Sequence, residues 1–586
     1  MRKRIWQPLL ILIGFVLLLV PPAMGQDGQP TPEQLKLRNE IAPALPGTIR
    51  QSLEKKTVRQ PSPMPEITIR TDEGKALDGA ADATFELEGV VFDGNEVISS
   101  KQLETLVRPY YDTDISVSTL QQITERITTY YIDQGYILSR AFLPPQEIKD
   151  GRVLIRVREG ALGRIIVKGN QRYKTEIFDR VMDIVKERGA VRRADLERAL
   201  LLLMDNPAMK VRADLMAGER PGTTDIIVHA EETKWWALGI DYNNFGSEYV
   251  GSDRIGLNAA FYSPFGWGDE LKLNFTAGDI DEMLYERVQY TLPINYSGTR
   301  LGLSFSHLDT DPDGVIADTV KSGSGDYASI WLSHPIVRSR TFNWWVDGGV
   351  DYDHTKNEFF DNTVYDDELY NARAGSQFQW VDGFAGNNSA YFDVVKGLKD
   401  ETLESTTFGA ESNFIKYELG FTRYQLIPLE TILTPYQLYA IFTANGQMSG
   451  DRLPSSQRIH IGGAGTVRGY EQSEYSGDRG VYATLEFRVP VWRPRVEWNW
   501  LRSFGSSAEL QLATFIDTGY YEVEKIAVNE PEADGSITGA GLGVRFQLDP
   551  TMLLRIDWAK SVAGEDPDVG HYDDDGVWYI QFSALY

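Results

Sequence analysis

The chain has 586 residues, of which 42% are apolar, so it is too apolar for a disordered protein and too long for one compact domain. It contains no cysteine, which excludes a disulfide framework, a thiolate zinc site, an iron–sulfur cluster and a catalytic thiol. The only apolar stretch long enough to rival a membrane helix lies within residues 5–24. A multi-helix membrane protein is therefore excluded, whereas one built from strands is not.

The N-terminus has the pattern of a secretory signal peptide. Arg2, Lys3 and Arg4 precede an apolar run over residues 5–20, and small residues around Ala23 and Gly25 form a cleavage site. We predict a signal peptide over residues 1–25, with an uncleaved anchor helix as the alternative. In either case the remainder leaves the cytoplasm, and a large exported protein without cysteine suggests a bacterial envelope.

The charge divides the chain near Lys234. Residues 1–234 carry 33 basic and 33 acidic side chains, whereas residues 235–586 carry 25 basic and 51 acidic ones. Nucleic acid is therefore not expected as a partner of the second part. The six histidines show no spacing typical of metal ligands, so we predict no metal site and no cofactor.

Residues 26–82 are rich in proline and polar residues, and we expect an exposed tail or linker with one possible short helix over 32–40. From residue 83 the sequence repeats at a spacing of 75 residues, anchored by Gly94-Asn95 and Gly169-Asn170. Each copy reads strand, turn, helix, helix, strand, strand, with helices expected near 100–110 and 118–134, then 174–187 and 193–205.

Two small α+β domains are therefore predicted, over residues 83–160 and 161–233. A small sheet with helices on one face leaves an edge strand that can pair with an extended peptide. Peptide capture and a mere spacer role remain equally open for these two domains.

The second part of the chain alternates apolar and polar residues with a period of two. In residues 270–277, for example, Leu271, Leu273 and Phe275 share one face and Lys272 and Asn274 the other. A soluble sandwich and an outer-membrane barrel both produce this pattern. About sixteen such runs occur, starting near residues 235, 252, 267, 282, 298, 325, 341, 371, 387, 412, 430, 481, 506, 536, 551 and 576.

The connections between these runs tend to alternate short and long, and the long ones (309–324, 354–370, 399–411, 520–535 and 561–575) are rich in acid. An even number of strands with short turns on one side favours a transmembrane barrel. We therefore predict a 16-stranded antiparallel transmembrane β-barrel over residues 234–586, with outer-membrane lipid on its apolar face.

A glycine-rich segment stands in the long connection before the run at 481. It contains Gly462, Gly463, Val467, Arg468, Gly469 and Tyr470. No Lys-Ser/Thr pair or helical pattern follows the glycines, so the segment does not match a phosphate-binding loop. Its glycines instead indicate close backbone packing in a confined space.

This segment resembles the signature of the lumen-inserted sixth extracellular loop in outer-membrane transporters and insertases with polypeptide-transport-associated (POTRA) domains. Phe515, Asp517 and Gly519 resemble the partner motif of that superfamily on the barrel wall. Both motifs have the expected positions, on a loop at about 445–480 between the eleventh and twelfth strands and on the thirteenth strand.

The N-terminal part resembles the first POTRA domain of two-partner secretion transporters, the haemolysin-activator and filamentous-haemagglutinin transporter type (TpsB). The matching residues are Gly135, Tyr136, Ser139, Arg140, Ala141, Leu143, Pro144, Pro145, Gln146, Asp150, Gly151, Glu159 and Gly160. Some family members carry an N-terminal plug helix, but Pro43 and Pro46 interrupt the segment where it would lie.

The resemblance implies a translocator and not an enzyme, with no catalytic residue. It implies that residues 83–233 capture an unfolded, TpsA-like exoprotein in the periplasm, which then passes through the barrel to the cell surface without ATP. The last run, which ends at Tyr586, resembles the C-terminal signal by which the barrel-assembly machinery handles outer-membrane proteins. An outer-membrane protein insertase is one alternative, and a porin or surface receptor is the other.

Asp517 lies on the polar face of its alternating run, which is the face expected to line the lumen. A carboxylate buried there needs a positively charged or hydrogen-bonding partner. Arg468 is the expected partner, because a guanidinium can bind a carboxylate through two hydrogen bonds and pin the loop to the wall. By the same parity, Tyr482, Glu486 and Arg488 are expected to face the lumen.

Overall fold

The computed structural model describes residues 44–54, 65–69, 84–186, 190–206, 208–220, 223–247, 249–312, 320–359, 363–399, 407, 409–428, 437–493, 505–525, 533–565 and 576–586. The predicted signal peptide and the possible helix at 32–40 lie outside these residues. Within them, no helix is both long and apolar enough to cross a membrane.

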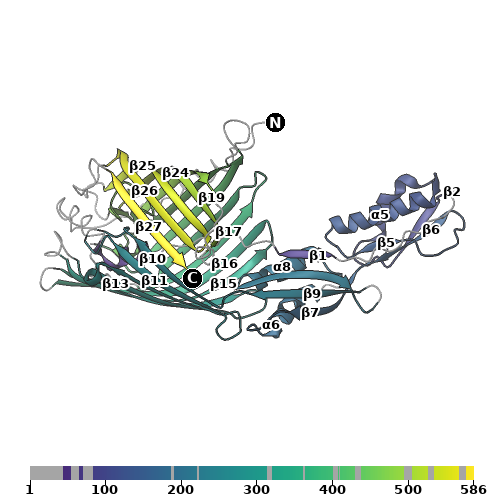
Figure 1. The fold of residues 1–586 in the computed structure, drawn as a ribbon, viewed down its shortest axis with the longest axis horizontal. Helices are drawn as coiled ribbons and strands as arrows, with labels where there is room; N and C mark the ends of the chain where they lie inside the picture. Colours follow the sequence, from purple (N-terminus) through teal and green to yellow (C-terminus); the bar gives the residue numbers. More distant parts are fainter. Residues whose placement is uncertain are drawn as a thin grey trace.

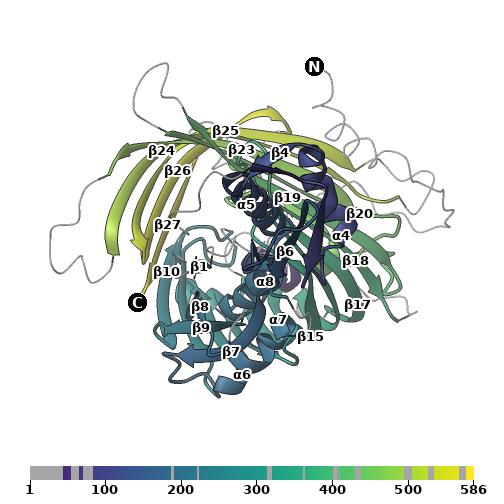
Figure 2. The same cartoon turned by 90° about the vertical axis from the view of Figure 1, so that its right-hand side faces the viewer.

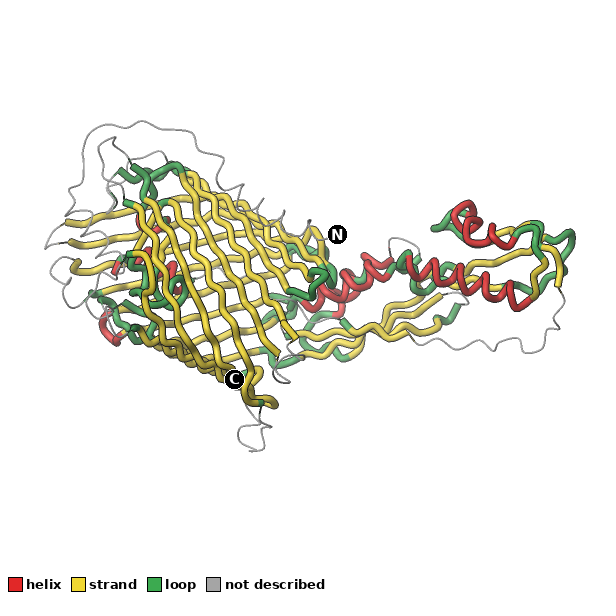
Figure 3. Tube along the Cα trace, turned by 90° about the horizontal axis from the view of Figure 1, so that it is seen from above, coloured by secondary structure: helices red, strands yellow, loops and turns green. Residues whose placement is uncertain are grey.

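Two small α+β units form an arm that extends from one end of a large barrel (Figures 1 and 3). The first unit packs its helices on one face of a three-stranded sheet ordered β3-β6-β5, beside a two-stranded sheet β2-β4. Its elements are β2 (Thr84–Glu86), β3 (Gly89–Asp93), α4 (Ser100–Val107), η2 (Arg108–Tyr110), β4 (Asp114–Ser116), α5 (Val117–Asp133), β5 (Arg140–Phe142) and β6 (Arg152–Arg158).

Local sequence explains where the helices of this unit begin and end. Ser99 and Gln102 form a capping box at the start of α4, and the Ser116 hydroxyl accepts the Thr119 N–H at the start of α5. Gly135 follows α5 with a φ of 92°, a conformation that favours glycine. The apolar face of α5 then packs against the alternate residues of β6 that point inward.

The second unit has the same plan. It contains β7 (Ala161–Lys168), α6 (Thr175–Val181), α7 (Asp183–Lys186), α8 (Arg193–Met204), β8 (Met209–Ala217) and β9 (Thr223–Glu232). Its sheet has the order β1-β8-β9-β7, in which β1 (Glu66–Ile69) belongs to the segment before the first unit and pairs with β8 in parallel. This part of the expected exposed linker is therefore a strand of the second sheet.

The remaining strands form a closed barrel of sixteen, in which each strand pairs antiparallel with its neighbours and β10 pairs with β27. The strands are β10 (Trp236–Asn243), β11 (Arg254–Tyr262), β12 (Glu270–Gly278), β13 (Met283–Pro293), β14 (Arg300–Thr310), β15 (Val320–Arg338), β16 (Phe342–Phe359), β17 (Thr363–Val381), β18 (Asn387–Gly397), β19 (Ile415–Pro428), β20 (Gln437–Ser449), β23 (Arg479–Trp492), β24 (Gly505–Glu522), β25 (Asp534–Pro550), β26 (Met552–Gly564) and β27 (Val577–Leu585). The predicted fold class is confirmed.

Alternation places apolar side chains on the outside of the barrel. Leu273 and Phe275 of β12 are exposed there, as are Leu303 and Phe305 of β14. Side chains of the opposite parity point inward and are mostly polar, as Asp351 and Asp353 on β16 show. This is the arrangement of a membrane barrel, whose outer face contacts lipid.

One expected long loop is wrong. Residues 354–370 are largely strand, because β16 continues to Phe359 and β17 begins at Thr363. Residues 354–358 are polar on both faces, so the ladder continues there without the apolar alternation by which the sequence marks a strand.

The expectation that residues 44–54 belong to an exposed linker is also wrong. Residues Pro46–Leu53 form helix α3, whose first four residues are buried and pack with barrel residues such as Tyr285 and Leu308. Pro46 stands in the first turn of this helix, where the missing N–H costs no hydrogen bond. The proline therefore starts the helix and does not interrupt it.

Buried polar contacts attach the second α+β unit to the barrel. Asp205, at the end of α8, receives hydrogen bonds from Arg338 Nε (3.0 Å) and Nη2 (2.6 Å). On the other side of this unit, the N–H of Lys174 donates to the carbonyl of Gly266, between β11 and β12. Figure 2 looks along the arm and shows both units in front of the open end of the barrel.

Candidate functional site

The segment between β20 and β23 folds back into the barrel. It contains η5 (Ser455–Gln457) and a short hairpin of β21 (Ile459–Ile461) and β22 (Tyr475–Gly477). Most of residues 452–480 are buried. We call this segment, residues 450–478, the lumenal loop.

Arg468 of the lumenal loop lies against Asp517 of β24. Its Nε and Nη2 donate to the two carboxylate oxygens at 2.6 and 2.9 Å, and its backbone N–H donates to the same carboxylate at 3.1 Å. Asp517 is completely buried, and the guanidinium also lies over the ring of Phe515, 3.2 Å from its centroid. Three hydrogen bonds and a ring contact therefore attach the tip of the loop to one strand.

The same guanidinium reaches two further strands. Its Nη1 donates to Glu486 of β23 at 3.1 Å and to Asp557 of β26 at 3.0 Å. Arg545 of β25 contacts both of these carboxylates. Arg488 donates to Glu486 and Arg555 to Asp557, so four guanidinium groups surround three carboxylates. In such a cluster each buried charge is compensated by opposite charges.

The two residues after Arg468 fix the loop to β26 and β27. The Gly469 N–H donates to the hydroxyl of Tyr579, which itself donates to the carbonyl of Tyr470. The Tyr470 hydroxyl lies 2.7 Å from that of Ser561. Gly469 has a φ of 98°, and a methyl group there would overlap the backbone of Lys560 and Ser561. Only glycine fits this position without strain.

The other residues of the two motifs shape the loop. The Gly462 N–H donates to the hydroxyl of Thr466, and Gly463 packs against Gln472. Val467 is buried with Ile461 and Tyr470. A side chain at Gly519 would meet those of Ile461 and Val467. The structure thus brings all nine residues of the two motifs into one assembly.

The sequence motifs do not identify four residues that hold the loop or belong to the charge cluster, namely Tyr579, Asp557, Arg545 and Arg555. They come from three strands, and no local motif marks them. The sequence feature that indicates them is their position in the alternating runs, which places Asp557 and Tyr579 on the inner face of the barrel. Of the three predicted lumenal residues, Glu486 and Arg488 belong to the charge cluster, and Tyr482 lines a polar cavity of about 520 Å³.

Helix α3 is a second element inside the barrel. Arg50 donates to Asp353 of β16 at 2.8 Å and lies over the ring of Tyr327. The side chain of Gln51 donates to the carbonyl of Ser456, at the base of the lumenal loop. Gln457 of the loop donates to the same oxygen of Asp353 as Arg50, at 3.1 Å. The helix and the loop therefore share a contact on the barrel wall.

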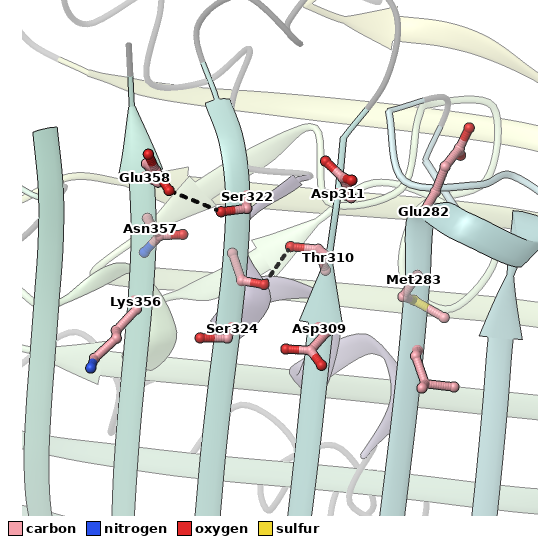
Figure 4. A pocket seen from close by; sticks show the side chains of 12 residues that line it. Glu282, Met283, Asp309, Thr310, Asp311, Ser322, Ser324, Lys356, Asn357 and Glu358 are labelled. Atoms are coloured by element: carbon pink, nitrogen blue, oxygen red, sulfur yellow. Dashed lines mark hydrogen bonds between the residues drawn. The ribbon is translucent and has the colours of Figure 1, made fainter. Parts of the chain in front are cut away.

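A separate, acidic cavity of about 490 Å³ lies at the outer ends of β13–β16 (Figure 4). Figure 4 shows Glu282, Asp309, Asp311 and Glu358 around it, and the Ser322 hydroxyl donates to Glu358. Within the described residues, no group of His, Asp or Glu side chains is arranged to hold a metal ion. The cavity shares no residue with the Arg468 cluster.

Comparison with known proteins identifies the family. The model of the haemolysin secretion/activation protein ShlB/FhaC/HecB matches residues 222–546, and that of the ShlB-type POTRA domain matches residues 85–160. The heme/hemopexin transporter protein HuxB of Haemophilus influenzae is 23% identical over 501 residues, which cover 83% of this chain and 84% of that protein. The outer membrane transporter CdiB of Dickeya dadantii is 23% identical over 473 residues, covering 78% and 81%.

Among solved structures, CdiB from Escherichia coli superposes with a TM-score of 0.69 at 18% identity, and the match covers 96% of this chain and 100% of that one. CdiB from Acinetobacter baumannii gives a TM-score of 0.63 and covers 94% and 98%. These likenesses show the fold. Together with the family match, they show that the chain belongs to the ShlB/FhaC/HecB haemolysin secretion/activation family and is an outer-membrane transporter of two-partner secretion with periplasmic POTRA domains.

Proposed function

We propose that this transporter captures one unfolded, TpsA-like exoprotein with its POTRA domains and passes it through the barrel lumen after α3 and the lumenal loop have moved aside. The observation that carries the proposal is how the lumen is filled. Two elements occupy it, and side chains of both elements hold them to the wall. Neither element is a strand of the closed barrel ladder, so each can leave without opening the barrel.

Arg468 has the central role in this proposal. Its bonds to Asp517, Glu486 and Asp557 join the loop to three strands. A buried ion pair that loses one partner destabilises the protein strongly, because the remaining charge is left without compensation. The cluster therefore favours two discrete positions of the loop, seated with every charge paired or withdrawn with the charges in water.

Capture would use the edge of a POTRA sheet, since an extended peptide can add to an edge whatever its sequence. The pairing of β1 with β8 supports this, because it shows an extended segment already added there in parallel. An exoprotein segment that took the place of β1 would form the same backbone hydrogen bonds.

The membrane partners follow from the surface of the barrel. Its exposed apolar face would contact outer-membrane lipid. The alternating residues of β27 up to Leu585, followed by Tyr586, would present the C-terminal strand to the barrel-assembly machinery. A passive porin is less well supported, because α3 and the loop occupy the lumen.

An insertase remains the second candidate, for one reason. The ladder between β10 and β27 covers residues 239–243 and 581–585 and is the shortest between neighbouring barrel strands, although backbone hydrogen bonds also join Leu238 to Tyr586 and Asn244 to Ile580. A short ladder is the natural place for a lateral opening, which an insertase needs and a translocator does not.

The test compares the surface and supernatant proteins of a deletion strain with those of the same strain carrying the wild-type gene or Arg468→Ala. We expect deletion and Arg468→Ala to remove the same single large exoprotein. Depletion of many outer-membrane barrels would favour the insertase, and an unchanged set of secreted proteins would contradict secretion altogether.

A further inference from the structure

Among the residues that the structure describes, none covers one face of the sheet of the first POTRA domain. Helices α4 and α5 pack on the other face, against Val153, Ile155 and Val157. Residues paired across the strands share a face, so the register identifies the uncovered side. Its side chains are Val91 and Asp93 of β3, Arg152, Leu154, Arg156 and Arg158 of β6, and Arg140 and Phe142 of β5. We call this surface the arginine face.

Four guanidinium groups stand on the arginine face, and all four residues are exposed. Arg156 donates to Asp93 at 2.8 Å, and Arg158 lies over the ring of Phe142, 5.3 Å from its centroid. Arg140, Arg152 and Arg158 form no ion pair with any described residue. Apolar side chains lie between the charges, and Val91 is 53% exposed.

The positive charge of the arginine face is opposite in sign to the net charge of the domain. Residues 83–160 carry eight basic and twelve acidic side chains, so the domain as a whole is acidic. Half of its basic residues nevertheless stand on the three strands of the arginine face, beside one carboxylate. Overall charge therefore does not explain the face.

The second POTRA domain provides an internal comparison. On the uncovered face of its sheet, Arg164 binds Asp225 at 2.8 Å, His229 lies 3.3 Å from Asp214, and Lys210 stands opposite Glu231. Arg164, His229 and Lys210 each have an acidic neighbour there, whereas Lys168, which stands opposite His229, forms no ion pair with a described residue. The repeated fold therefore does not require the uncompensated charge of the first domain.

The position of the arginine face argues against a membrane lipid as its ligand. The first POTRA domain is at the end of the arm farthest from the barrel (Figure 1). Attraction between exposed charges is screened over about 8–10 Å at physiological ionic strength. Contact with the outer-membrane surface is therefore not available to these arginines.

We propose that the arginine face binds a segment of the unfolded exoprotein in which carboxylates alternate with apolar residues. This inference rests on the proposed function and adds the site of first contact and the chemistry of the segment. The guanidinium groups would bind carboxylates, and Val91, Leu154 and Phe142 would contact the apolar residues. Exposed charge pairs speed encounter more than they add affinity, which suits a segment that must later be released.

The binding test uses the full-length protein in lipid nanodiscs and two short synthetic unstructured peptides. One peptide alternates Glu with apolar residues, and the other has Gln in place of every Glu. We expect the Glu peptide to bind more tightly and to lose its advantage at high salt. The double variant Arg152→Glu/Arg158→Glu should weaken its binding by about tenfold, from lost pairing and new repulsion.

A matched control makes the same change of charge on the helical side of the same domain. Lys101 and Arg126 are exposed on α4 and α5, so Lys101→Glu/Arg126→Glu should change binding by less than about twofold if attraction is local. The variant Arg152→Gln/Arg158→Gln removes the two positive charges without introducing negative ones, so it tests the same contacts if charge reversal disturbs the fold. Equal affinity for the two peptides, or equal losses in the two reversed variants, would overturn the proposal.

Photo-cross-linking in cells that secrete the exoprotein distinguishes a failure of this inference from a failure of the proposed function. A photoreactive residue in place of Val91 should cross-link to the exoprotein, and Arg152→Glu/Arg158→Glu should abolish the cross-link and lower secretion. If that variant secretes normally, or if only soluble peptidoglycan fragments attach at Val91, the inference is wrong while secretion stands. If deletion of the gene removes no exoprotein, the proposed function itself fails.

Discussion

Arg50 of α3 and Asp353 of β16 form an ion pair inside the barrel, with 2.8 Å between Nη2 and Oδ2 and with both side chains largely buried. The oxygen that accepts from Arg50 also accepts from Gln457 of the lumenal loop. One carboxylate on the wall thus holds both elements that fill the lumen. Release of the helix removes the positive charge that compensates Asp353, which weakens the seat of the loop as well.

We therefore expect Arg50→Ala to open the resting pore. Loss of one partner of a buried ion pair typically costs about 3–5 kcal/mol, because the remaining charge is left without compensation. Conductance in planar lipid bilayers should rise, and Asp353→Asn should have the same direction of effect. Arg423→Ala, which removes an ion pair with Asp382 elsewhere on the wall, is the control and should leave conductance unchanged. A closed pore in both lumenal variants would show that this contact does not retain the helix.

Arg468→Ala is expected to abolish secretion while the barrel still assembles. The variant leaves the Asp517 carboxylate buried without its positive partner. The loss weakens the attachment of the loop to the barrel wall but removes no hydrogen bond between barrel strands. Immunoblots of the exoprotein measure secretion, and the heat-modifiable migration of the folded barrel measures assembly. Arg488→Ala removes a guanidinium that is one-third exposed and bonds to Glu486 alone, so it should secrete at close to the normal level. Normal secretion by Arg468→Ala would contradict the pinning role.

Gly469→Ala should unseat the loop without any change of charge. The added methyl group meets the backbone of Lys560 and Ser561, and the residue has a positive φ. Strain of this kind costs about 1–3 kcal/mol, and limited proteolysis of the loop would report the release. Gly450→Ala is the matched control, because a methyl group there meets no atom within 4 Å. Equal protease resistance in the two variants would mean that the close approach at Gly469 has no consequence.

The second POTRA domain should lose stability in acid through Asp225. The backbone N–H and the guanidinium of Arg164 hold the pKa of this carboxyl below its ordinary value. A carboxyl whose pKa is lower in the folded state stabilises the fold above its unfolded pKa, and this contribution is lost as the pH falls through the folded value. The hydrogen-exchange protection factors of β7 and β9 in the intact protein, which correct for the intrinsic pH dependence of exchange, should therefore fall below about pH 4. Asp225→Asn should flatten this pH dependence, and an unaltered profile would exclude the Arg164 pair as its cause.

The sequence predicts the barrel well because one face of most strands meets an apolar environment. Predicted starts at 387 and 551 agree with Asn387 of β18 and Met552 of β26. Beyond the apolar band both faces are polar and alternation disappears, so the sequence pattern predicts a loop at residues 354–358, where the structure has strand. Parity also places Asp517 in the lumen, where the structure has it completely buried.

Contacts between distant segments could not be predicted in this way. Helix α3 is stabilised by Asp353 and Ser456, more than 300 residues along the chain, and its own sequence resembles a proline-containing linker. Tyr579, which holds Gly469 and Tyr470, has no motif around it. The two motifs identified the tip of the loop, whereas the rest of its seat depends on closure of the barrel.

The central claim, that the exoprotein passes through the lumen, is tested most directly by photo-cross-linking at two adjacent residues of β23. Tyr482 lines the polar cavity inside the barrel, and Val481 is 46% exposed on the outer face. A photoreactive residue in place of Tyr482 should cross-link to the exoprotein during secretion, whereas one in place of Val481 should not. Cross-linking at Val481 with none at Tyr482 would contradict passage through the lumen.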